Sequence, residues 1–330
     1  MSEHKPIQLG LCCLNTILRT QNPPIFASRR MIMRTIREKG IFALKQRILL
    51  NLSDLLKMIE WNEQNGIKVF RLSSEAFPHK SNPRIENYAF DFALESLKKI
   101  GVLAKKYGQR LTMHPGQFNC IASPSENTFK NTVSDLSYQA TFLDLLGADI
   151  HSVMVIHGGG LYGDKAAAKK RWCENYYKLP ENVQKRLVLE NCERIFHIED
   201  CLEISKKINI PIVFDTHHFE CYKLMHPDEK FKDPEYYIPL ILETWKRRGI
   251  KPKFHISEQG SGRCGHHSQY VETVPPYLLE IPKKYNISID IMVEAKMKEQ
   301  AIFKLYRKYP FLDCKKISDK IKIKINLNFI

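Results

Sequence analysis

Residues 186–218, which read RLVLENCERIFHIEDCLEISKKINIPIVFDTHH, contain the pattern that decides the fold. A short aliphatic run, Arg186–Glu190, is followed by a periodic stretch over Glu193–Lys207 and then by a second aliphatic run, Ile210–Asp215. Short runs of β-branched and aliphatic residues predict buried strands, and the longer periodic stretch predicts a helix between them. Each of the two runs also ends on a carboxylate, so the same unit supplies a fold signal and a chemical group.

The strand-then-helix unit recurs along the whole chain. Eight apolar runs predict strands: Ile7–Cys13, Lys68–Ser73, Arg110–His114, Ser152–His157, Arg186–Glu190, Ile210–Asp215, Lys251–Ile256 and Ser288–Glu294. Helical periodicity marks stretches between them: Asn51–Gln64, Tyr88–Tyr107, Val133–Leu146, Glu193–Lys207, Glu235–Arg248, Val271–Tyr285 and Lys298–Tyr309. We therefore predict an α/β fold, a single (β/α)8 TIM barrel. The competing open doubly wound sheet usually has a Gly-rich loop after its first strand, and none occurs here.

The net charge is the second feature to explain. The 330 residues carry a formal charge of +15, and 43% of them are hydrophobic. We assign residues 1–310 to one barrel domain that contains a basic link over 16–48, and residues 311–330 to a basic tail or edge strand. Residues 1–48 hold nine basic and two acidic side chains, and residues 311–330 hold five and two. Such a surplus argues for an anionic partner, most often nucleic acid, against the alternative of a merely solubilising surface.

Composition also excludes several classes of protein. No stretch approaches the roughly 18 to 20 apolar residues of a membrane span, and the N-terminus lacks a signal-peptide cleavage site. The nine cysteines form no CxxC pair, which favours reduced thiols over disulfides or a cysteine-bound zinc. We expect a monomer in an intracellular reducing compartment, either the cytoplasm, the nucleus or, for a viral protein, the host cell.

The carboxyl ends of the predicted strands carry the chemistry. Six consecutive strands each end on, or within a few residues of, a histidine, aspartate or glutamate: His114, His157, Glu190, Asp215 with His218, His255 and Glu294. In a TIM barrel these ends converge on the face where active sites lie. A single such residue is more often a capping or paired side chain, but seven at one level would leave unpaired buried charge without a metal. The pattern predicts a metal site at the carboxyl ends of the strands.

Several carboxylates among shared histidines favour more than one ion. Two ions a few ångströms apart are typical of phosphoester hydrolysis, and the basic charge points to nucleic acid as the phosphodiester. A sugar isomerase or epimerase on a similar barrel needs no such charge and is the alternative. Candidates for phosphate contact are Arg29, Arg30, Arg34, Lys165 and Arg263, with simple solvation as an equally plain explanation.

The chain resembles the ultraviolet-damage endonucleases, relatives of endonuclease IV and of the xylose-isomerase-like barrels. The resemblance covers about residues 7–300 and rests on motifs that occur in a fixed order: LGLCCLN, NLSDLLKMIEWN, FRLSSEAFP, RLTMHPGQF, HGGGLYGDK, LVLENCER, IVFDTHHF, KFHISEQG and DIMVEAKMKEQ. It implies a metal-dependent DNA-repair enzyme that nicks immediately 5′ to pyrimidine dimers, 6-4 photoproducts and, in some cases, abasic sites, leaving 3′-hydroxyl and 5′-phosphate ends.

The resemblance also implies roles for individual residues. It implies up to three ions, usually Mn²⁺, held by His114, His157, Glu190, Asp215, His218, His255, His267 and Glu294. Lys253 matches a lysine that is carboxylated in the family, and Asn15 matches an asparagine that orients substrate or water. Catalytic roles fall to Glu190, Lys253, His255 and Asn15, while Gln117 and Phe118 match a pair that holds the lesion out of the stack. His217 and His266 adjoin predicted ligands, and the spacing from Asp215 favours His218.

One position departs from the family pattern. Relatives carry a ligand histidine where this chain has Asn82, and His79, three residues earlier, is the candidate replacement. An amide oxygen binds a metal more weakly than imidazole does. Two further hypotheses therefore stay open beside a nuclease acting on damaged double-stranded DNA: an abasic-site endonuclease of the endonuclease IV type, and a lesion-binding protein with impaired nuclease activity.

Overall fold

The computed structural model describes residues 6–85 and 88–315, in which eight parallel strands form one sheet. The strands pair in the order β3-β2-β1-β8-β7-β6-β5-β4. Their bounds are β1 Ile7–Cys12, β2 Val69–Arg71, β3 Arg110–Thr112, β4 Met154–His157, β5 Leu187–Glu190, β6 Ile212–Asp215, β7 Lys253–Ile256 and β8 Ile289–Val293. Each of the eight predicted strands is present, shortened at one or both ends.

The two outer strands of this order, β3 and β4, close the ring. Met113, the residue after β3, forms a parallel bridge with Met154. Its amide donates to Val153 O at 2.9 Å, and its carbonyl accepts from Val155 N at 2.9 Å. This short contact completes a (β/α)8 barrel, as predicted.

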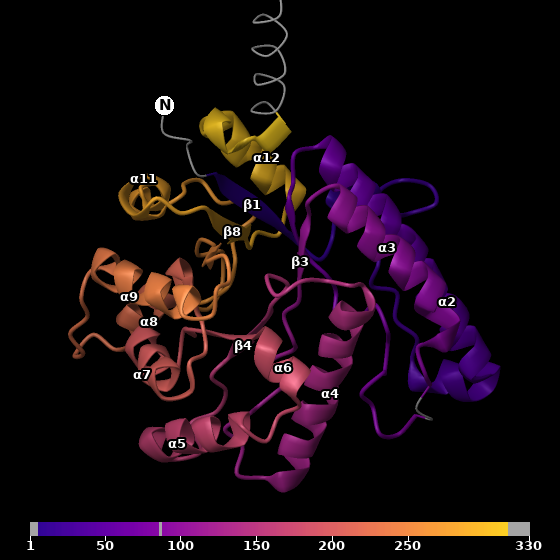
Figure 1. The fold of residues 1–330 in the computed structure, drawn as a ribbon, viewed down its shortest axis with the longest axis horizontal. Coiled ribbons are helices and arrows are strands. Elements are labelled where there is room, and N and C mark those ends of the chain that lie inside the picture. Colours follow the sequence, from indigo (N-terminus) through magenta and orange to yellow (C-terminus); the bar gives the residue numbers. More distant parts are fainter. Residues whose placement is uncertain (1–5, 86–87, 316–330) are drawn as a thin grey trace, which may run out of the picture.

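Helices surround the strands on all sides (Figure 1). The longer ones are α2 Met33–Gln64, α3 Leu94–Lys106, α4 Glu126–Leu145, α5 Lys165–Tyr176, α7 Ile198–Ile208, α8 Thr216–Met225, α9 Pro234–Lys246 and α12 Glu299–Lys308. The shorter ones are α1 Thr16–Arg19, η1 Asp91–Ala93, α6 Glu181–Arg186, α10 Pro276–Leu279, α11 Ile281–Tyr285 and η2 Pro310–Leu312. Every residue of β5 to β8 is buried, as expected for parallel strands enclosed by helices.

The prediction of a long basic link over 16–48 is wrong in its second half. Residues 33–48 belong to α2, which begins 18 residues before the expected start at Asn51. Gly40 interrupts this helix with φ 76° and ψ 172°, a left-handed conformation that other residues adopt only with strain. Many charged residues around that kink hide the helical periodicity in the sequence.

Other differences concern helix boundaries. Helices α5, α6 and α8 were not predicted, and the single helix expected over Val271–Tyr285 is two short helices, each with proline at its first turn. At the C-terminus Leu312 is fully buried in the core, so the chain stays packed on the barrel beyond residue 310. The alternating lysines and isoleucines of the predicted tail fall in 316–330, outside the described residues.

Candidate metal centre

Ligand-type side chains from neighbouring strands meet at the carboxyl end of the barrel. His157 and Glu190 are the last residues of β4 and β5, and Asp215 is the last residue of β6. His255 lies within β7, and Glu294 directly follows β8. A cavity of about 740 Å³ opens above them, and its lining includes His114, His157, His218, His267 and Glu294.

Glu190 lies at the centre of this group. Its carboxylate is 1% exposed and has imidazoles on both oxygens. Oε2 lies 2.9 Å from His114 Nε2 and 3.0 Å from His157 Nε2. Oε1 lies 2.7 Å from His255 Nδ1 and 3.7 Å from His218 Nδ1. Four histidines from four different segments thus converge on one buried carboxylate.

The electrostatics of the cluster favour an ionised Glu190. Burial alone would raise the pKa of Glu190, but the imidazoles of His255 and His157 hold it well below its usual range. Burial lowers the pKa of His114, which keeps that ring neutral and able to donate a lone pair. Burial also opposes the charge on His218, but Asp215 and Glu190 outweigh it and raise the pKa of His218 to about 9.

Asp215 is fixed by the helix that follows it. Its Oδ1 accepts hydrogen bonds at 2.8 Å from the backbone amides of His217 and His218, so it caps the N-terminus of α8. Its Oδ2 is buried and has no hydrogen-bond partner among the described residues. This cap turns His218 toward Glu190, while the His217 ring lies beside the Cys221 thiol at 3.5 Å. The geometry therefore selects His218 over His217.

Glu294 links the cluster to the far side of the cavity. Its Oε1 lies 3.3 Å from His255 Nδ1 and pairs with Arg71, the last residue of β2. Its Oε2 lies 3.9 Å from His267 Nδ1, whereas the neighbouring His266 bonds to Arg263. Burial would raise the pKa of Glu294, but the Arg71 guanidinium lowers it strongly.

Arg71 was missed in the sequence. It occupies the same strand-end level as the predicted ligands, and it lines the central cavity. The signal was available, because the strand-end rule applies to cations as well as to metal ligands. A strand-end arginine is not a metal ligand, so the ligand pattern alone does not predict its position beside Glu294.

Lys253 is the most unusual residue of the cluster. It is fully buried on β7, and its amine contacts His255 Nε2. Burial and the nearby charge of Arg71 lower the pKa of Lys253 to about 7. A large fraction of this amine is therefore neutral near pH 7, in contrast to an ordinary surface lysine.

The donor atoms fit divalent metal ions. Two groups of three side chains, His114–Glu190–His255 and His157–Glu190–His218, place their ligand atoms within 4.8 Å of one another. Asp215 Oδ2, which accepts no hydrogen bond among the described residues, faces the same region and lies 3.8 Å from His218 Nδ1. Imidazole and carboxylate donors together suit Mn²⁺, Zn²⁺ or Fe²⁺.

Two predicted residues have structural partners instead. The side chain of Asn15 caps α1 by accepting from Leu18 N at 2.8 Å, although its buried Nδ2 has no partner among the described residues. His79 bonds through Nε2 to Met31 O at 2.7 Å, and its Nδ1 lies 3.2 Å from Asn82 Nδ2. His79 and Asn82 line a neighbouring cavity of about 500 Å³ rather than the central one.

The candidate DNA contacts divide into two sets. Gln117, Arg30 and Arg263 line the central cavity, and Phe118 is 66% exposed beside it. Arg29 and Lys165 form ion pairs within the protein. Arg29 pairs with Asp54 at 2.6 Å, and Lys165 pairs with Asp200 at 3.0 Å. Arg34 is exposed, pairs with Glu38 on its own helix and lines none of these cavities. The pairing of Arg29 and Lys165 argues against free phosphate-binding roles for them.

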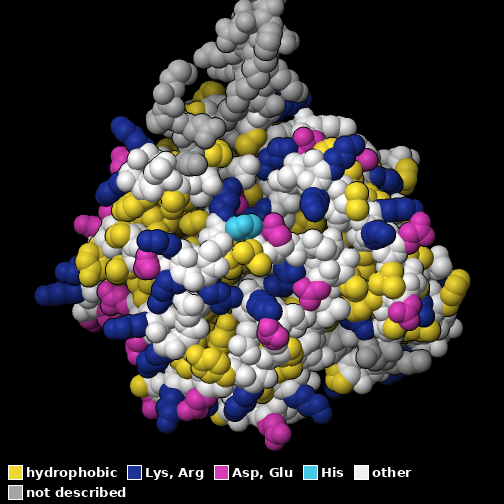
Figure 2. Space-filling view, viewed as in Figure 1, with side chains coloured by type: hydrophobic (Ala, Val, Ile, Leu, Met, Phe, Trp, Pro, Cys, Tyr) yellow, Lys and Arg dark blue, Asp and Glu magenta, His cyan; other side chains and the backbone are white. Residues whose placement is uncertain are grey.

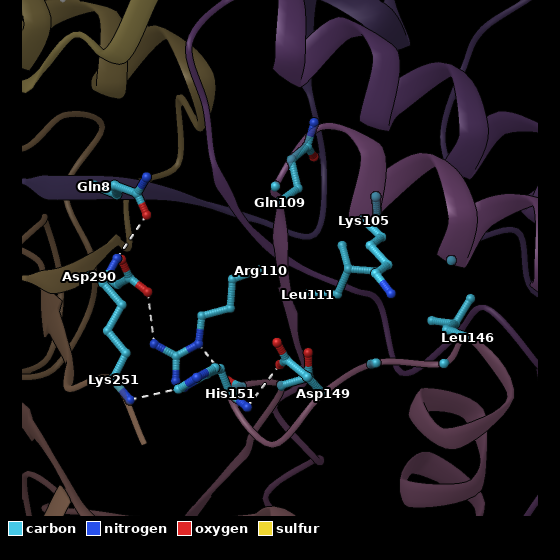
Figure 3. A pocket seen from close by; sticks show the side chains of 16 residues that line it. Gln8, Lys105, Gln109, Arg110, Leu111, Leu146, Asp149, His151, Lys251 and Asp290 are labelled. Atoms are coloured by element: carbon cyan, nitrogen blue, oxygen red, sulfur yellow. Dashed lines mark hydrogen bonds and ion pairs between the residues drawn. The ribbon is translucent and has the colours of Figure 1, made fainter. Parts of the chain in front are cut away.

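A further cavity, of about 340 Å³, lies at the opposite end of the barrel (Figure 3). Arg110, the first residue of β3, and Asp290, the second residue of β8, form an ion pair of 2.7 Å there. Lys251 bonds to the other oxygen of Asp290 and to Gln8 Oε1 at 2.8 Å. Asp290 is fully buried, and each of its oxygens has a cationic partner.

Comparison with known proteins over most of the chain identifies its family. The sequence model of UV-endonuclease UvdE matches residues 7–328. A putative UV-damage endonuclease of Acanthamoeba polyphaga mimivirus is 41% identical over 308 residues, which are 92% of this chain and 91% of the relative. The chain belongs to the UV-damage endonuclease family. A UV DNA damage endonuclease of Bacillus cereus is 34% identical over 85% of this chain and 86% of its own length.

Membership in the UV-damage endonuclease family makes the chain a nuclease, that is, a hydrolase that cleaves phosphodiester bonds. The chain spans about half of the UV-damage endonuclease of Schizosaccharomyces pombe, at 38% identity over 92% of this chain and 52% of that one. The solved structure of SacUVDE matches with a TM-score of 0.75 and 27% identity, over 96% of this chain and 99% of that one. A D-tagatose 3-epimerase-like protein, at 16% identity and a TM-score of 0.56, shares the fold alone.

The length and apolar character of the helices bear on whether any of them could cross a membrane. None of the helices in the described part of the chain has the length and apolar character needed to cross a bilayer.

Proposed function

We propose that the chain is a metal-dependent DNA-repair endonuclease that nicks double-stranded DNA immediately 5′ to an ultraviolet lesion. The lesions would be pyrimidine dimers and 6-4 photoproducts, with abasic sites as a further substrate, and the products would carry 3′-hydroxyl and 5′-phosphate ends. The observation that carries this proposal is Glu190 with its four imidazoles, in a chain of this family. A carboxylate shared by two ligand groups suits a pair of ions acting on one phosphodiester.

The ligands fall into sets around that shared carboxylate. His114 and His255 would hold one ion with Glu190, and His157 and His218 would hold a second with the same residue. Ions held there lower the pKa of water toward neutrality and neutralise charge on the phosphate. The buried histidines would keep fixed orientations while substrate binds, because each is held by contacts within the cluster.

Donors remain for a third ion. Glu294 and His267 lie 3.9 Å apart, and Asp215 Oδ2 is free of other hydrogen bonds among the described residues. Arg71 balances the charge of Glu294, so that the carboxylate stays ionised at the cavity wall. We propose up to three ions, with Mn²⁺ preferred among the ions that suit these donors because the family resemblance implies it.

We also propose that Lys253 is carboxylated. Its pKa of about 7 leaves neutral amine available at physiological pH. The neutral amine adds CO2, forming an N–C bond and releasing one proton, which converts a buried cation into an anion. That anion would lie beside His255 and remove the desolvation cost of an unpaired ammonium.

Lesion recognition would use the loop after His114. Phe118 is largely exposed, and Gln117 lines the cavity, so both could enter a distorted duplex. Damaged base pairs unstack at lower cost than intact ones, which makes such an insertion selective. The aromatic ring of Phe118 would supply a face on which a base can stack. Arg30 and Arg263 would contact phosphates at the rim.

A plasmid-nicking experiment tests this function. Supercoiled plasmid, either irradiated with ultraviolet light, depurinated or untreated, is incubated with the metal-stripped protein and with the protein supplied with Mn²⁺. We expect conversion of irradiated plasmid to nicked circles only with Mn²⁺, and loss of nicking in EDTA. Nicking that survives exhaustive chelation would contradict the metal-dependent mechanism.

The other hypotheses give different outcomes in the same experiment. Preferential nicking of the depurinated plasmid would favour an abasic-site endonuclease. Tight binding of irradiated DNA without any nicking, even with Mn²⁺, would favour a lesion-binding protein. End-labelling of the nicked product then determines the cleavage position and the chemistry of both ends.

The thiols support a reducing compartment. All nine cysteines are free thiols, and four of them are buried in the barrel. We propose an intracellular location and a monomeric enzyme. A single peak at about 39 kDa in light scattering would agree with the monomer, and a peak at twice that mass would contradict it.

A further inference from the structure

A groove of about 540 Å³ lies beside the central cavity and carries four arginines, Arg19, Arg29, Arg30 and Arg47, against one carboxylate, Glu75. The two spaces are continuous, because Cys13, Arg30, Ser73 and Glu75 line both of them. The groove is built by the end of α1, the loop between α1 and α2, α2 itself and the loops that follow β1 and β2. Across one face of the molecule, by contrast, cationic and anionic side chains are interspersed (Figure 2).

The four arginines differ in how their charge is balanced. Arg29 pairs with Asp54, and Arg30 pairs with Glu75 at 3.0 Å. In residues 6–85 and 88–315, no carboxylate lies within 4.0 Å of the guanidinium of Arg19 or Arg47. Arg47 is half-buried, so part of its hydration is lost without a counter-charge in return. The groove therefore holds two cations whose charge the described protein does not neutralise.

Arg29 fixes the shape of the groove instead of filling it. Its guanidinium bonds to Pro24 O at 2.8 Å and to Asp54, and its amide donates to Asn51 Oδ1 at 2.9 Å. Asp54 also accepts from Phe26 N at 3.1 Å. These contacts tie the loop to α2, which presets the positions of the other arginines before any ligand binds.

The chemistry of the groove favours a phosphate backbone over bases. Arginine matches phosphate with two parallel hydrogen bonds, and the matching improves when the side chain is already desolvated. The Phe26 ring already has two cationic neighbours, Arg29 at 4.0 Å and Arg19 at 5.0 Å from its centroid, which compete with a base for stacking on it. The groove would read charge and spacing rather than sequence.

We propose that Arg19 and Arg47 bind backbone phosphates of the DNA strand that leaves the metal-bearing cavity past Arg30. This inference rests on the proposed function, because it assumes a DNA strand in the central cavity. According to this inference, residues 16–48 guide one DNA strand along a defined path. They would not act merely as a diffuse basic surface. Each phosphate contact releases counterions, so the groove would make binding depend steeply on salt.

The test compares two doubly substituted proteins of equal charge. One carries Arg19→Gln and Arg47→Gln in the groove. The control carries Arg37→Gln and Lys39→Gln, two exposed residues of α2 that do not line the groove. Affinity for an undamaged 30-base-pair duplex is measured by fluorescence anisotropy in EDTA, between 50 and 200 mM salt. Because neither damage nor metal is needed, the readout is independent of nicking.

We expect the groove variant to lose about 1.8 in the slope of log K against log salt, at about 0.9 per phosphate contact. The control should lose less than about half of that. Over a range of concentrations of irradiated plasmid with Mn²⁺, the groove variant should show a raised KM and, once the plasmid is saturating, the wild-type kcat. Arg47→Lys, which keeps the charge but loses the two-point contact, should fall between wild type and Arg47→Gln.

Three results would overturn the inference. The first is an unchanged salt slope in the groove variant. The second is an equal loss in the control, which would mean diffuse surface charge. The third is an acidic peptide, polyglutamate of matched charge, that binds more tightly than duplex and loses affinity in the groove variant. If the double variant fails to fold by circular dichroism, the single substitutions give the same comparison at about 0.9 in slope each. Absence of nicking by the wild type would instead overturn the proposed function.

Discussion

The two ends of the barrel hold similar residues in opposite states. At the amino end Asp290 has a cation on each oxygen, Arg110 on one and Lys251 on the other. At the carboxyl end Glu190 is surrounded by imidazoles, and Asp215 keeps a buried oxygen without a hydrogen-bond partner among the described residues. At the amino end both carboxylate oxygens are paired with cations, although Arg110 Nη2 is buried without a hydrogen-bond partner among the described residues, whereas the carboxyl end has a carboxylate oxygen left over for a ligand. The difference teaches that a buried carboxylate paired with cations has a structural role in this fold, whereas buried carboxylates among imidazoles are available to bind a ligand.

The largest expected effect is at the carboxyl end. Glu190→Gln removes the anion shared by both ligand groups, so we expect nicking with Mn²⁺ to fall by about 10³-fold or more, equivalent to about 4 kcal/mol of lost transition-state stabilisation. The rate is measured on irradiated plasmid at saturating Mn²⁺. Far-UV circular dichroism checks that the fold is retained.

The control for this variant is Glu95→Gln. Glu95 is exposed on α3 and pairs with Lys99, and its substitution should leave nicking unchanged. A nicking rate in Glu190→Gln equal to that of the control would mean that the metal centre is misassigned.

The amino end should show the reverse pattern. Asp290→Asn leaves Arg110 and Lys251 facing a neutral amide inside the barrel, so we expect the free energy of unfolding to drop by about 3 to 5 kcal/mol. Urea denaturation measures the loss, and nicking at a temperature where the variant is folded should match wild type. Asp149→Asn, an exposed carboxylate on the same cavity, should cost less than about 1 kcal/mol. Equal losses in the two variants would remove the contrast between the ends.

The contrast could be predicted only in part from the sequence. Aliphatic runs and their carboxyl-terminal residues were enough to predict the barrel and to bring His114, His157, Glu190, His218 and His255 to one face, because parallel strands must end together. The ion pairs of Asp290 with Arg110 and Lys251 could not be predicted. They join residues far apart in sequence, so their partners are decided by packing rather than by local pattern.

Arg29 and Lys165 are surface examples of ion pairs whose partners could not be predicted from the sequence. Both looked like free cations, but Asp54 and Asp200, 25 and 35 residues away, neutralise them. Arg19 and Arg47 looked no different in sequence and lack such partners in the described chain. Helix α8 was missed for a related reason, because the DTHH motif suggested ligands and concealed that Asp215 also caps a helix.

A pH measurement sharpens the comparison through Lys253. Its pKa is lowered to about 7 in the folded protein by burial, against about 10.4 in an unfolded chain. Between these values the unfolded chain binds the extra proton, so the free energy of unfolding contributed by Lys253 rises with pH, by at most about 1.4 kcal/mol per pH unit. His218, with its pKa raised to about 9, acts in the opposite direction and loses stabilisation as the pH rises from about 6.5 through 9.

The variant Lys253→Met separates the two effects. Both proteins contain His218, so the difference in unfolding free energy, wild type minus Lys253→Met, isolates the lysine. Measured in EDTA by urea denaturation, that difference should be flat below pH 7 and rise between about pH 7 and 10. A flat difference over the whole range would mean that the amine titrates normally, in which case Lys253 would resemble the paired cations of the amino end.

The smallest expected effect is at the edge of the metal-bearing end. Asn82→His restores the histidine that the family pattern expects, beside His79 in the cavity next to the central one. An imidazole donates more strongly than an amide oxygen, so we expect Mn²⁺ affinity to rise by about tenfold or less, with a smaller change in rate at saturating Mn²⁺. Isothermal titration of the metal-stripped protein measures the affinity. The companion variant His79→Gln should have little effect if His79 only holds Met31 O in place. Loss of one Mn²⁺ from the stoichiometry in His79→Gln would instead make His79 the replacement ligand, and Asn82→His would then restore it in the double variant.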